Sequence, residues 1–387
     1  MVVGAYYPEV SGGGLQCRTL VRALSGRAGF GVLTTTASAV AQIRNVIDDA
    51  QVYRLHVDPQ RPWTKLRALY QLLRLMPELS RRCEVIHFHG FTQKMIILRA
   101  LAWILRVPVV QKMTSLGHDD PISIRRRQGA FVYHTFASAS RFVSVSPALS
   151  DQYAESGLPP SRLVFIPNGV DVDRFRPVDA SEKARLRNEH RLPAASQIVT
   201  FVGFWSPEKG PDLLVEAWLS AVQATSRSSF LLFLGASNTR HPEVESHYST
   251  RLRDRLDQEA GGRYRVVEET HAVEEFLQAS DIFVLPSVRE GLPNALLEAM
   301  AVGLACIAVD IPGVTGWLLS DRDNGFLIPP GDAAALTRVL VPLMADETER
   351  RNVGDRARST VMQRFSAATL AEAYFTLYSS LARSIGT

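Results

Sequence analysis

Two glutamates, Glu290 and Glu298, are separated by seven residues across an expected loop-to-helix junction. Ionised carboxylates accept strong hydrogen bonds from neutral hydroxyl groups, so this pair suits a sugar or a ribose. Pro293 favours a helix start, where free N–H groups and the helix dipole attract a phosphate or diphosphate. The spacing indicates a nucleotide-sugar site, but a helix with a solvated acidic first turn would carry the same two glutamates.

Two glycine-containing loops could act on the same diphosphate. Lys209 follows an expected strand that ends near Gly203, and its ammonium could neutralise charge growing on a leaving diphosphate. Gly12, Gly13 and Gly14 form an expected loop between the first strand and the first helix, where glycine lets a backbone approach a ligand closely. A surface lysine and a plain turn are the structural alternatives.

The elements that must position these residues alternate between apolar strand-like runs and segments with helical periodicity. That alternation is typical of parallel α/β sheets. In the first half we expect strands at 2–6, 31–34, 85–89, 107–111, 142–145 and 163–166. In the second half we expect them at 198–202, 230–234, 265–267, 282–285 and 306–309. Residues 360–383 carry apolar side chains at helical spacing, which predicts a terminal helix.

Length and composition fit two globular domains. The chain has 387 residues, 46% hydrophobic and 21% charged, which excludes a single small module and a disordered or fibrous protein. The three cysteines are far apart and indicate neither a disulfide framework nor a zinc site: Cys17, Cys83 and Cys306. The longest apolar stretch, 95–110, is interrupted by Arg99 and Arg106, so we expect no membrane span and a cytoplasmic protein. Because the chain opens directly in a strand, we expect its natural start to lie upstream.

Charge is divided unevenly along the chain. Residues 1–177 contain 22 Lys and Arg against 12 Asp and Glu, whereas the remainder contains 21 against 27. A basic first half suits a phosphorylated or lipid-linked acceptor, or peripheral contact with the inner face of an anionic membrane. Candidate patches are 95–106 and 122–133, each of which could also be an ordinary helix with solvated arginines. The chain lacks aromatic platforms with basic spacing, so we expect no nucleic-acid binding.

Several motifs together resemble the retaining glycosyltransferases of family 4, and they cover most of the chain. They are Pro8 with Gly12–Gly14, the segments 166–171, 202–203, 208–210, 279–287 and 303–310, the Glu290-to-Glu298 element, and 324–327 with 330–332. The resemblance implies a GT-B fold, two Rossmann-like domains facing across a cleft. Residues 1–177 with a crossing helix at about 360–387 would bind the acceptor, and residues 178–359 would bind the nucleotide-sugar donor.

The resemblance also implies roles for individual residues. Glu298 would bind the ribose, Glu290 would hold sugar hydroxyls, and Lys209 with two helix starts would bind the diphosphate. The catalytic positions implied are Lys209, Glu290 and His118. The donor-binding positions implied are Gly12, Gly13, Gly14, Gly203, Lys209, Glu290, Gly291, Leu292, Pro293, Asn294 and Glu298. Domain closure would align the acceptor hydroxyl with the anomeric carbon, and the departing phosphate would take the acceptor's proton.

The chain departs from the family pattern in two places. The family's histidine near the donor sugar has no clear counterpart here: His118 is one candidate, and Lys112, Thr114 or Ser115 could take its place. Phe204 stands where the family usually has an arginine, which removes one expected phosphate partner. The strand histidines His87 and His89 point to one face, and they suit either the site or a hydrogen-bonded strand end.

We expect no metal and no cofactor other than the donor substrate. Asp119 and Asp120 are adjacent carboxylates, a poor divalent site without further ligands, and the GT-B enzymes that the chain resembles generally use protein charges instead. The chain has neither a Gly-x-Ser-x-Gly elbow nor a nucleotide-triphosphate loop. A weakly active nucleotide-sugar-binding regulatory subunit and a phosphorylase or epimerase remain alternatives, since a fold does not fix a reaction. Among transferase roles, we expect the synthesis of a surface polysaccharide or glycolipid.

Overall fold

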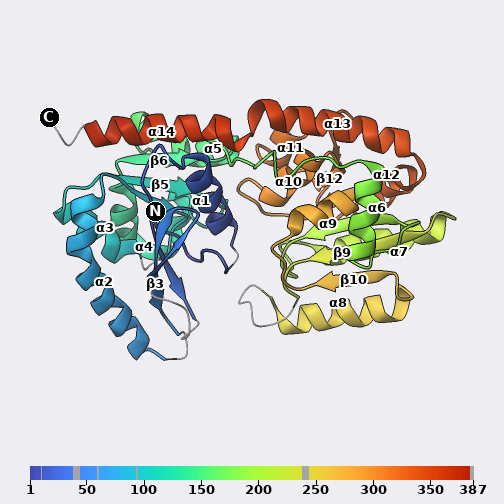
Figure 1. The fold of residues 1–387 in the computed structure, drawn as a ribbon, viewed down its shortest axis with the longest axis horizontal. Coiled ribbons are helices and arrows are strands. Elements are labelled where there is room, and N and C mark those ends of the chain that lie inside the picture. Colours follow the sequence, from blue (N-terminus) through green and yellow to red (C-terminus); the bar gives the residue numbers. More distant parts are fainter. Residues whose placement is uncertain (10, 38–43, 59–60, 93–94, 238–243, 384–387) are drawn as a thin grey trace. The chain divides into compact units, whose positions relative to one another are not determined.

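The computed structural model describes residues 1–387 apart from 10, 38–43, 59–60, 93–94, 238–243 and 384–387 (Figure 1). The chain divides into two compact units: unit 1 is Met1–Gly169 with Ala367–Thr387, and unit 2 is Val170–Ser366. The sequence analysis placed the domain boundary after residue 177, whereas the structure divides the chain after Gly169. Residues 170–177 belong to unit 2, where the N–H of Val170 donates to the carbonyl of Phe365 at 2.9 Å. Both units contain parallel sheets flanked by helices, which confirms the predicted α/β class.

Unit 1 contains two sets of strands joined by one residue. The strands are β1 Gly31–Thr36, β2 Arg44–Ile47, β3 Ala50–His56, β4 Ile86–His89, β5 Val109–Met113, β6 Arg141–Ser144 and β7 Leu163–Phe165. Their orders are β1-β3-β2 and β4-β5-β6-β7, parallel except that β2 runs antiparallel to β3. The predicted strand 2–6 is wrong beyond Val2, which bridges to Leu33 and Phe88. After Val3 the chain bends away, and the Gly4 carbonyl accepts from the hydroxyls of Thr34 and Thr35 instead of from a strand.

The helices of unit 1 pack around these strands. They are α1 Gly12–Ala23, α2 Trp63–Arg82, α3 Met95–Ile104, α4 Pro121–Ala137, α5 Pro147–Glu155, a short 3-10 turn Pro160–Arg162, and α14 Ala367–Arg383. Leu20 and Leu24 of α1 share a core cluster with Tyr374, Leu377 and Leu381 of α14. The last helix of the chain is therefore part of the core of unit 1.

The predicted terminal helix at 360–383 is in fact two helices. Helix α13 ends at Arg364 and α14 begins at Ala367, with Phe365 and Ser366 between them. The ring of Phe365 is buried, its carbonyl accepts from Val170, and Ser366 bridges to Val170. These contacts hold Phe365 and Ser366 against Val170, and the helix is interrupted at these two residues.

Unit 2 contains one six-stranded parallel sheet in the order β10-β9-β8-β11-β12-β13. Its strands are β8 Gln197–Val202, β9 Ser229–Leu234, β10 Tyr264–Val267, β11 Ile282–Leu285, β12 Ala305–Val309 and β13 Phe326–Ile328. Its helices are α6 Ala180–Glu189, α7 Pro211–Ala224, α8 Ser246–Glu259, α9 Val273–Ala279, α10 Asn294–Val302, α11 Thr315–Leu318, α12 Ala333–Ala345 and α13 Glu347–Arg364. All five predicted strands are present, and β13 was not predicted.

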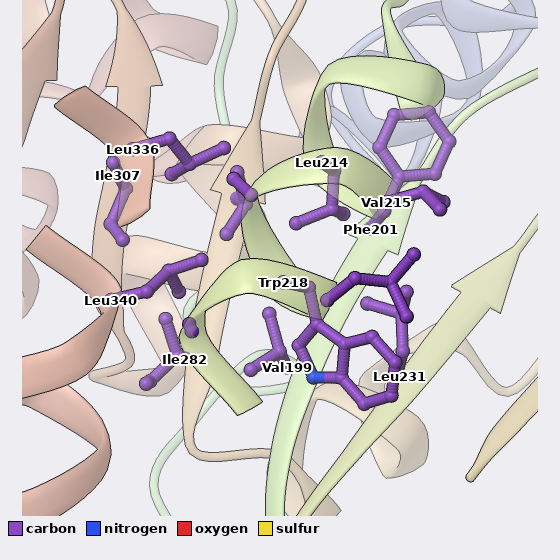
Figure 2. Close-up of a cluster of buried hydrophobic side chains, with 14 of the residues drawn as sticks. Val199, Phe201, Leu214, Val215, Trp218, Leu231, Ile282, Ile307, Leu336 and Leu340 are labelled. Atoms are coloured by element: carbon purple, nitrogen blue, oxygen red, sulfur yellow. The ribbon is translucent and has the colours of Figure 1, made fainter. Parts of the chain in front are cut away.

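The core of unit 2 explains why its central strands read as continuous apolar runs. Every residue of β11 and β12 is buried, as expected for strands covered on both faces. Figure 2 shows α7 laying Trp218 and Leu214 against β8, with α12 packed beside them. The indole N–H of Trp218 donates to the Ser229 hydroxyl at 2.9 Å, so the buried polar atom is satisfied.

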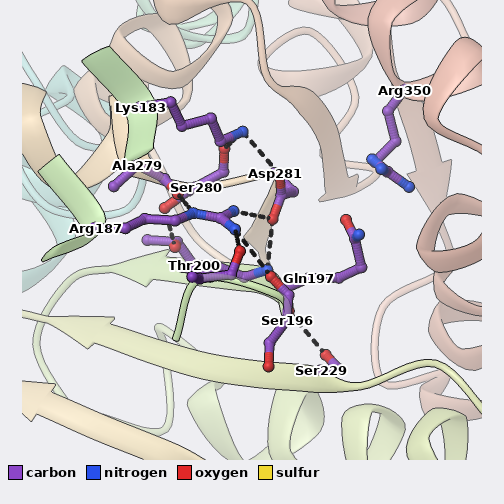
Figure 3. A network of polar contacts seen from close by, with 12 residues as sticks. Lys183, Arg187, Ser196, Gln197, Thr200, Ser229, Ala279, Ser280, Asp281 and Arg350 are labelled. Carbon is purple, nitrogen blue, oxygen red and sulfur yellow. Dashed lines mark hydrogen bonds and ion pairs between the residues drawn. The ribbon is translucent and has the colours of Figure 1, made fainter. Parts of the chain in front are cut away.

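A partly buried network of ion pairs and hydrogen bonds is centred on Asp281, directly before the amino-terminal end of β11 (Figure 3). Asp281 accepts from Lys183 at 2.7 Å, from Arg187 at 2.6 Å and from the backbone of Ile198 at 2.7 Å. Arg187 also donates to the carbonyl of Ala279. The network lies at the strand end opposite to the β11–α10 junction, so it supports the sheet without entering the candidate site.

Candidate functional site

The predicted loop-to-helix junction is confirmed. The fully buried strand β11 ends at Leu285, and α10 begins at Asn294 with Pro293 as its N-cap residue. The first turn of such a helix presents backbone N–H groups without helical partners beyond the carboxyl end of the sheet. Gly291, Leu292 and Pro293 are buried, so only their backbone could face a ligand.

Lys209 and Glu290 meet directly. The Lys209 ammonium lies 2.7 Å from a carboxylate oxygen of Glu290, with the carboxylate mostly buried and the lysine side chain about one third exposed. The pair joins the loop after β8 to the loop after β11, 81 residues apart in sequence. The sequence predicted both residues as site groups, and the structure brings them together.

Two further contacts hold the same pair of loops. Arg289 forms an ion pair with Glu208, and the backbone N–H of Val288 donates to the Glu208 carbonyl at 2.9 Å. Gly210 has a φ of 61°, and a Cβ on it would stand 2.7 Å from the carbonyl oxygen of Pro286. Only glycine fits this approach without a shift, which explains the Lys-Gly sequence of the loop.

Glu298 lies about one turn into α10 and is partly buried. Burial raises the pKa of its carboxyl to about 8, with the charge of Arg174 opposing the shift and that of Glu274 adding to it. Arg174 itself donates to Glu274 at 2.6 Å and to the carbonyl of His271 at 2.7 Å. Sequence reasoning missed Arg174 and Glu274; the signal was available, since Arg174 lies just after the predicted 166–171 motif.

Gly203 lies directly after β8 and packs tightly against the next strand end. Its N–H donates to the Leu234 carbonyl at 2.9 Å, and a Cβ on Gly235 would stand 2.4 Å from the Gly203 carbonyl oxygen. Phe204, in the position where an arginine was expected, is partly buried, and Trp205 after it is fully buried. The N–H of Trp205 also donates to the carbonyl of Ala236 at 3.0 Å, so this strand end is tied to its neighbour, and Lys209 is the cation that follows it.

The sequence predicted that the three glycines of unit 1 form a loop before the first helix, and this prediction is wrong. Gly12, Gly13 and Gly14 are the first residues of α1, and the Ser11 hydroxyl caps the helix by accepting from Gly14 N–H at 3.0 Å. A Cβ on Gly14 would stand 2.3 Å from the Ala5 carbonyl oxygen, so the absent side chain serves packing there. The donor-binding role of the three glycines stays a prediction.

His118 is exposed on a turn, and its backbone N–H donates to the carbonyl of Ser115 at 3.3 Å. Its neighbours Asp119 and Asp120 serve the backbone: Asp119 accepts from Thr114 and Ser115, and Asp120 caps α4. In the described ranges no group of three or more His, Cys, Asp or Glu residues could hold a metal ion. The two aspartates therefore have structural partners, and the catalytic role of His118 stays a prediction.

A buried polar cluster in unit 1 was only partly foreseen. His87 and His89 share a strand face as predicted, with ring centroids 4.2 Å apart. Tyr378 of α14 lies 2.6 Å from His87 Nδ1, but neither ring nitrogen of His89 has a partner among the described residues. Lys112 is buried beside them with its ammonium 5.5 Å from the centre of the Tyr374 ring. Burial lowers the pKa of Lys112 to about 7.

Two family models match the chain, and they divide it as the fold does. The model described as a glycosyl transferase 4-like domain matches residues 11–169, and the model described as glycosyl transferases group 1 matches residues 196–346. The matched ranges lie in unit 1 and unit 2 respectively.

Relatives of the whole chain are glycosyltransferases or synthases. The Escherichia coli UDP-Gal:alpha-D-GlcNAc-diphosphoundecaprenol alpha-1,3-galactosyltransferase is 27% identical over 73% of this chain and 70% of its own length. The Bacillus anthracis N-acetyl-alpha-D-glucosaminyl L-malate synthase is 23% identical over 97% of this chain and 96% of its own. The structure of Anabaena HepE in complex with UDP and glucose superposes with a TM-score of 0.78 at 18% identity, covering 98% of this chain and 99% of HepE. That likeness shows the fold.

Proposed function

Because the chain belongs to the group 1 glycosyl transferases of family 4, with the GT-B fold, it is a glycosyltransferase, and we propose that its donor is a nucleoside-diphosphate sugar. The observation that carries the proposal is the Lys209–Glu290 pair beside the start of α10. It sets a cation, a carboxylate and a helix N-terminus at one sheet edge, which together suit a diphosphate and a polyhydroxyl sugar.

In the proposed reaction the anomeric configuration is retained. The acceptor oxygen forms a bond to the anomeric carbon as the bond from that carbon to the diphosphate oxygen breaks, and the acceptor's proton passes to the leaving phosphate. Lys209 stabilises the charge that grows on the leaving group. Glu290 holds sugar hydroxyls and Glu298 the ribose. Neither a metal ion nor a further cofactor is part of this proposal.

The acceptor that we propose is a glycan carrying a phosphate or a lipid diphosphate, in the synthesis of a surface polysaccharide or glycolipid. The uneven distribution of charge along the chain supports this acceptor, because unit 1 contains most of the first half, in which Lys and Arg outnumber Asp and Glu. The E. coli relative acts on a diphosphoundecaprenol-linked sugar, which is the same class of acceptor. Peripheral contact of unit 1 with the inner face of a membrane belongs to this proposal, and the cytoplasmic location stays a prediction. No observation favours the regulatory, phosphorylase or epimerase alternatives.

The test begins with thermal-shift binding of uridine, guanosine and adenosine diphosphate sugars, because a ligand that binds only the native state raises the melting temperature. With the donor found, we expect Lys209→Met to lower turnover by about 10²–10³-fold while donor binding persists, as for other charge-stabilising groups. Arg338→Met, an exposed change on α12 of unit 2, is the matched control and should leave turnover unchanged. Full turnover in Lys209→Met, or no donor binding by the folded protein, would refute the proposal.

A further inference from the structure

Helix α2 carries large apolar side chains on its exposed face. Trp63, Leu66, Tyr70 and Leu73 are 54%, 71%, 58% and 49% exposed, and their spacing places them in one stripe along the helix. The opposite face of α2 packs Ala68, Leu72 and Leu75 into unit 1. A helix that is apolar on its solvent face as well as on its core face signals a binding surface. We call these four exposed residues the outer α2 stripe.

Basic side chains flank the outer α2 stripe, and the acidic residues nearest to it in the sequence are Asp58 before it and Glu78 beyond it. Lys65, Arg67 and Arg74 are exposed, and the sequence from 59 to 77 contains no Asp or Glu. The Arg74 guanidinium lies 5.5 Å from the centre of the Tyr70 ring, so its stem runs along the apolar stripe while its charge reaches the rim. Leucine and aromatic side chains rimmed by arginine and lysine are the composition of a helix that lies in a membrane interface.

A neighbouring helix extends this surface. Trp103 and Ile104 at the end of α3 are 81% and 65% exposed. Glu78 of α2 and Leu105, directly after α3, line the same cavity of about 740 Å³. Exposed apolar side chains therefore occur on both of these helices of unit 1.

The patches expected from the sequence differ from this surface. Arg99 in the 95–106 patch is buried and donates to the carbonyls of Thr135 and Phe136, so it cannot face a lipid. In the 122–133 patch Ile124 is buried beneath the arginines. The exposed part of the 95–106 patch is its end, with Trp103, Ile104 and Arg106, and Phe131 is the one large apolar side chain exposed near the arginines of α4, whereas α2 carries a stripe of four.

We propose that unit 1 docks on an anionic lipid membrane through the outer α2 stripe and the exposed end of α3. Charge decides between this partner and a second copy of the chain. Two copies paired through the same stripe would bring Arg67 and Arg74 of each copy together, and Glu78, the one carboxylate in the sequence of α2, already pairs with Arg44. An anionic bilayer offsets those charges and takes up the tryptophan, tyrosine and leucine side chains at its interface.

Membrane docking would bring the transferase to a lipid-linked acceptor, and only this biological role rests on the proposed function. Binding is measured by co-flotation with vesicles of phosphatidylcholine alone or with about a third phosphatidylglycerol, at about 0.1 M salt, without donor or acceptor. Either proposal can therefore fail without the other. We expect binding to the anionic vesicles only, with a blue shift of tryptophan emission that Trp63→Phe reduces.

Paired variants separate the two contributions. Leu66→Ser with Leu73→Ser should weaken partitioning at least tenfold, because both side chains leave the interface. Arg67→Gln with Arg74→Gln should weaken binding to anionic vesicles by about fivefold for each charge, which corresponds to about 1 kcal/mol per basic residue near the surface. Phe131→Ser, an exposed aromatic on α4, is the matched control and should bind as the wild type does.

All the substituted side chains are exposed, so circular dichroism and melting temperature should stay unchanged. Equal vesicle binding by the wild type and the double serine variant would overturn the proposal, as would no binding by the wild type. A wild-type dimer that the double serine variant converts to a monomer would also overturn it and assign the stripe to a second copy of the chain.

Discussion

Glu298 shows how the surroundings of a single residue alter the chemistry read from its type. The sequence places a glutamate one turn into a helix, and an exposed glutamate would be fully ionised near neutral pH. Burial instead raises the pKa of this carboxyl to about 8. The hydrogen bonds that it could accept from a ribose therefore depend on pH.

Nucleotide affinity should rise with pH through the pKa of Glu298. With a pKa of about 8, the ionised fraction grows from about a tenth at pH 7 to about nine tenths at pH 9. If the ribose needs the carboxylate, the association constant of the nucleoside diphosphate rises by about tenfold over that range. Isothermal titration at several pH values measures this, and Glu298→Gln should show no such rise. An equal rise in the glutamine variant would assign the effect to another group.

Lys112 should make the stability of unit 1 depend on pH. Its pKa is about 7 in the folded state and 10.5 for an unburied lysine, so the unfolded chain binds more protons between these limits. Stability therefore increases as pH rises from 7 towards 9, and below pH 7 the full cost of the buried charge is present. Lys112→Met should raise the free energy of unfolding at pH 7 by about 1–3 kcal/mol and reduce the increase towards pH 9.

Calorimetric melting of the Lys112→Met protein at pH 7, 8 and 9 gives this comparison. Lys65→Met, at an exposed position of α2, serves as the control and should change neither the melting temperature nor its pH dependence. If Lys112→Met lowers the melting temperature at every pH, the ammonium is charged and well solvated in the folded protein, and the expectation is wrong.

At the scale of elements, the loops after β8 and β11 behave as one structure. Glu208 and Lys209 on the first pair with Arg289 and Glu290 on the second, and Gly210 lets the backbones approach. The positions of Lys209 and Glu290, the two candidate catalytic residues, thus depend on Gly210, which has no side chain.

Gly210→Ala should disturb this junction by two effects. A Cβ at φ 61° is strained, and it would also stand 2.7 Å from the Pro286 carbonyl oxygen. We expect a loss of about 2–4 kcal/mol in the stability of unit 2 and a larger fall in turnover than in donor binding. Gly262→Ala is the matched control, with a φ of 74° and open space around the added Cβ. It should cost only about 1 kcal/mol, so equal losses in the two variants would show that the contact with Pro286 is unimportant.

The sequence predicted the elements of unit 2 better than those of unit 1. The strands β8, β9, β11 and β12 are covered on both faces, so each is a mainly apolar run, with Gln197 and Thr200 in β8 and Ser229 in β9 as the polar exceptions. By contrast β2 is half exposed and joined to β3 by a tight Asp48-Asp49 turn with positive φ at both residues, and its alternating pattern is too short to recognise. The pairs around Lys209 and Glu290 are contacts over some 80 residues, which no local pattern encodes.

At the scale of the whole molecule, unit 1 is discontinuous in sequence. Its core includes Ala371, Tyr374, Leu377 and Leu381 from the last helix, whereas unit 2 is one continuous segment. The resemblance of the motifs to a GT-B family implied a returning helix, but the break at Phe365 and Ser366 depends on contacts with Val170 that helical periodicity does not report.

Removal of residues 367–387 should therefore unfold unit 1 and spare unit 2. The deletion removes four side chains of the core and uncovers those packed against them, which include Leu20, Leu24 and Ile166. The burial of a large apolar side chain contributes about 1.5–3 kcal/mol, so the total loss is comparable to the whole stability of a domain. Limited proteolysis with mass spectrometry should show rapid cleavage within 1–169 and a resistant fragment at about 170–366. A chain that lacks only residues 384–387 is the control and should resist as the full chain does. Native resistance of 1–169 in the long deletion would contradict the assigned core.

The chain leaves unit 1 at Gly169 and returns to it at Ala367, and these two points touch: a Cβ on Gly169 would stand 3.0 Å from the Cα of Ala367. During synthesis, the segment from 1 to 169 therefore emerges from the ribosome first but lacks the helix that completes its core. Unit 2 emerges whole before that helix is made. We expect the second unit to finish folding first, while the earlier segment waits, exposed to chaperones, until the helix at 367–383 has emerged.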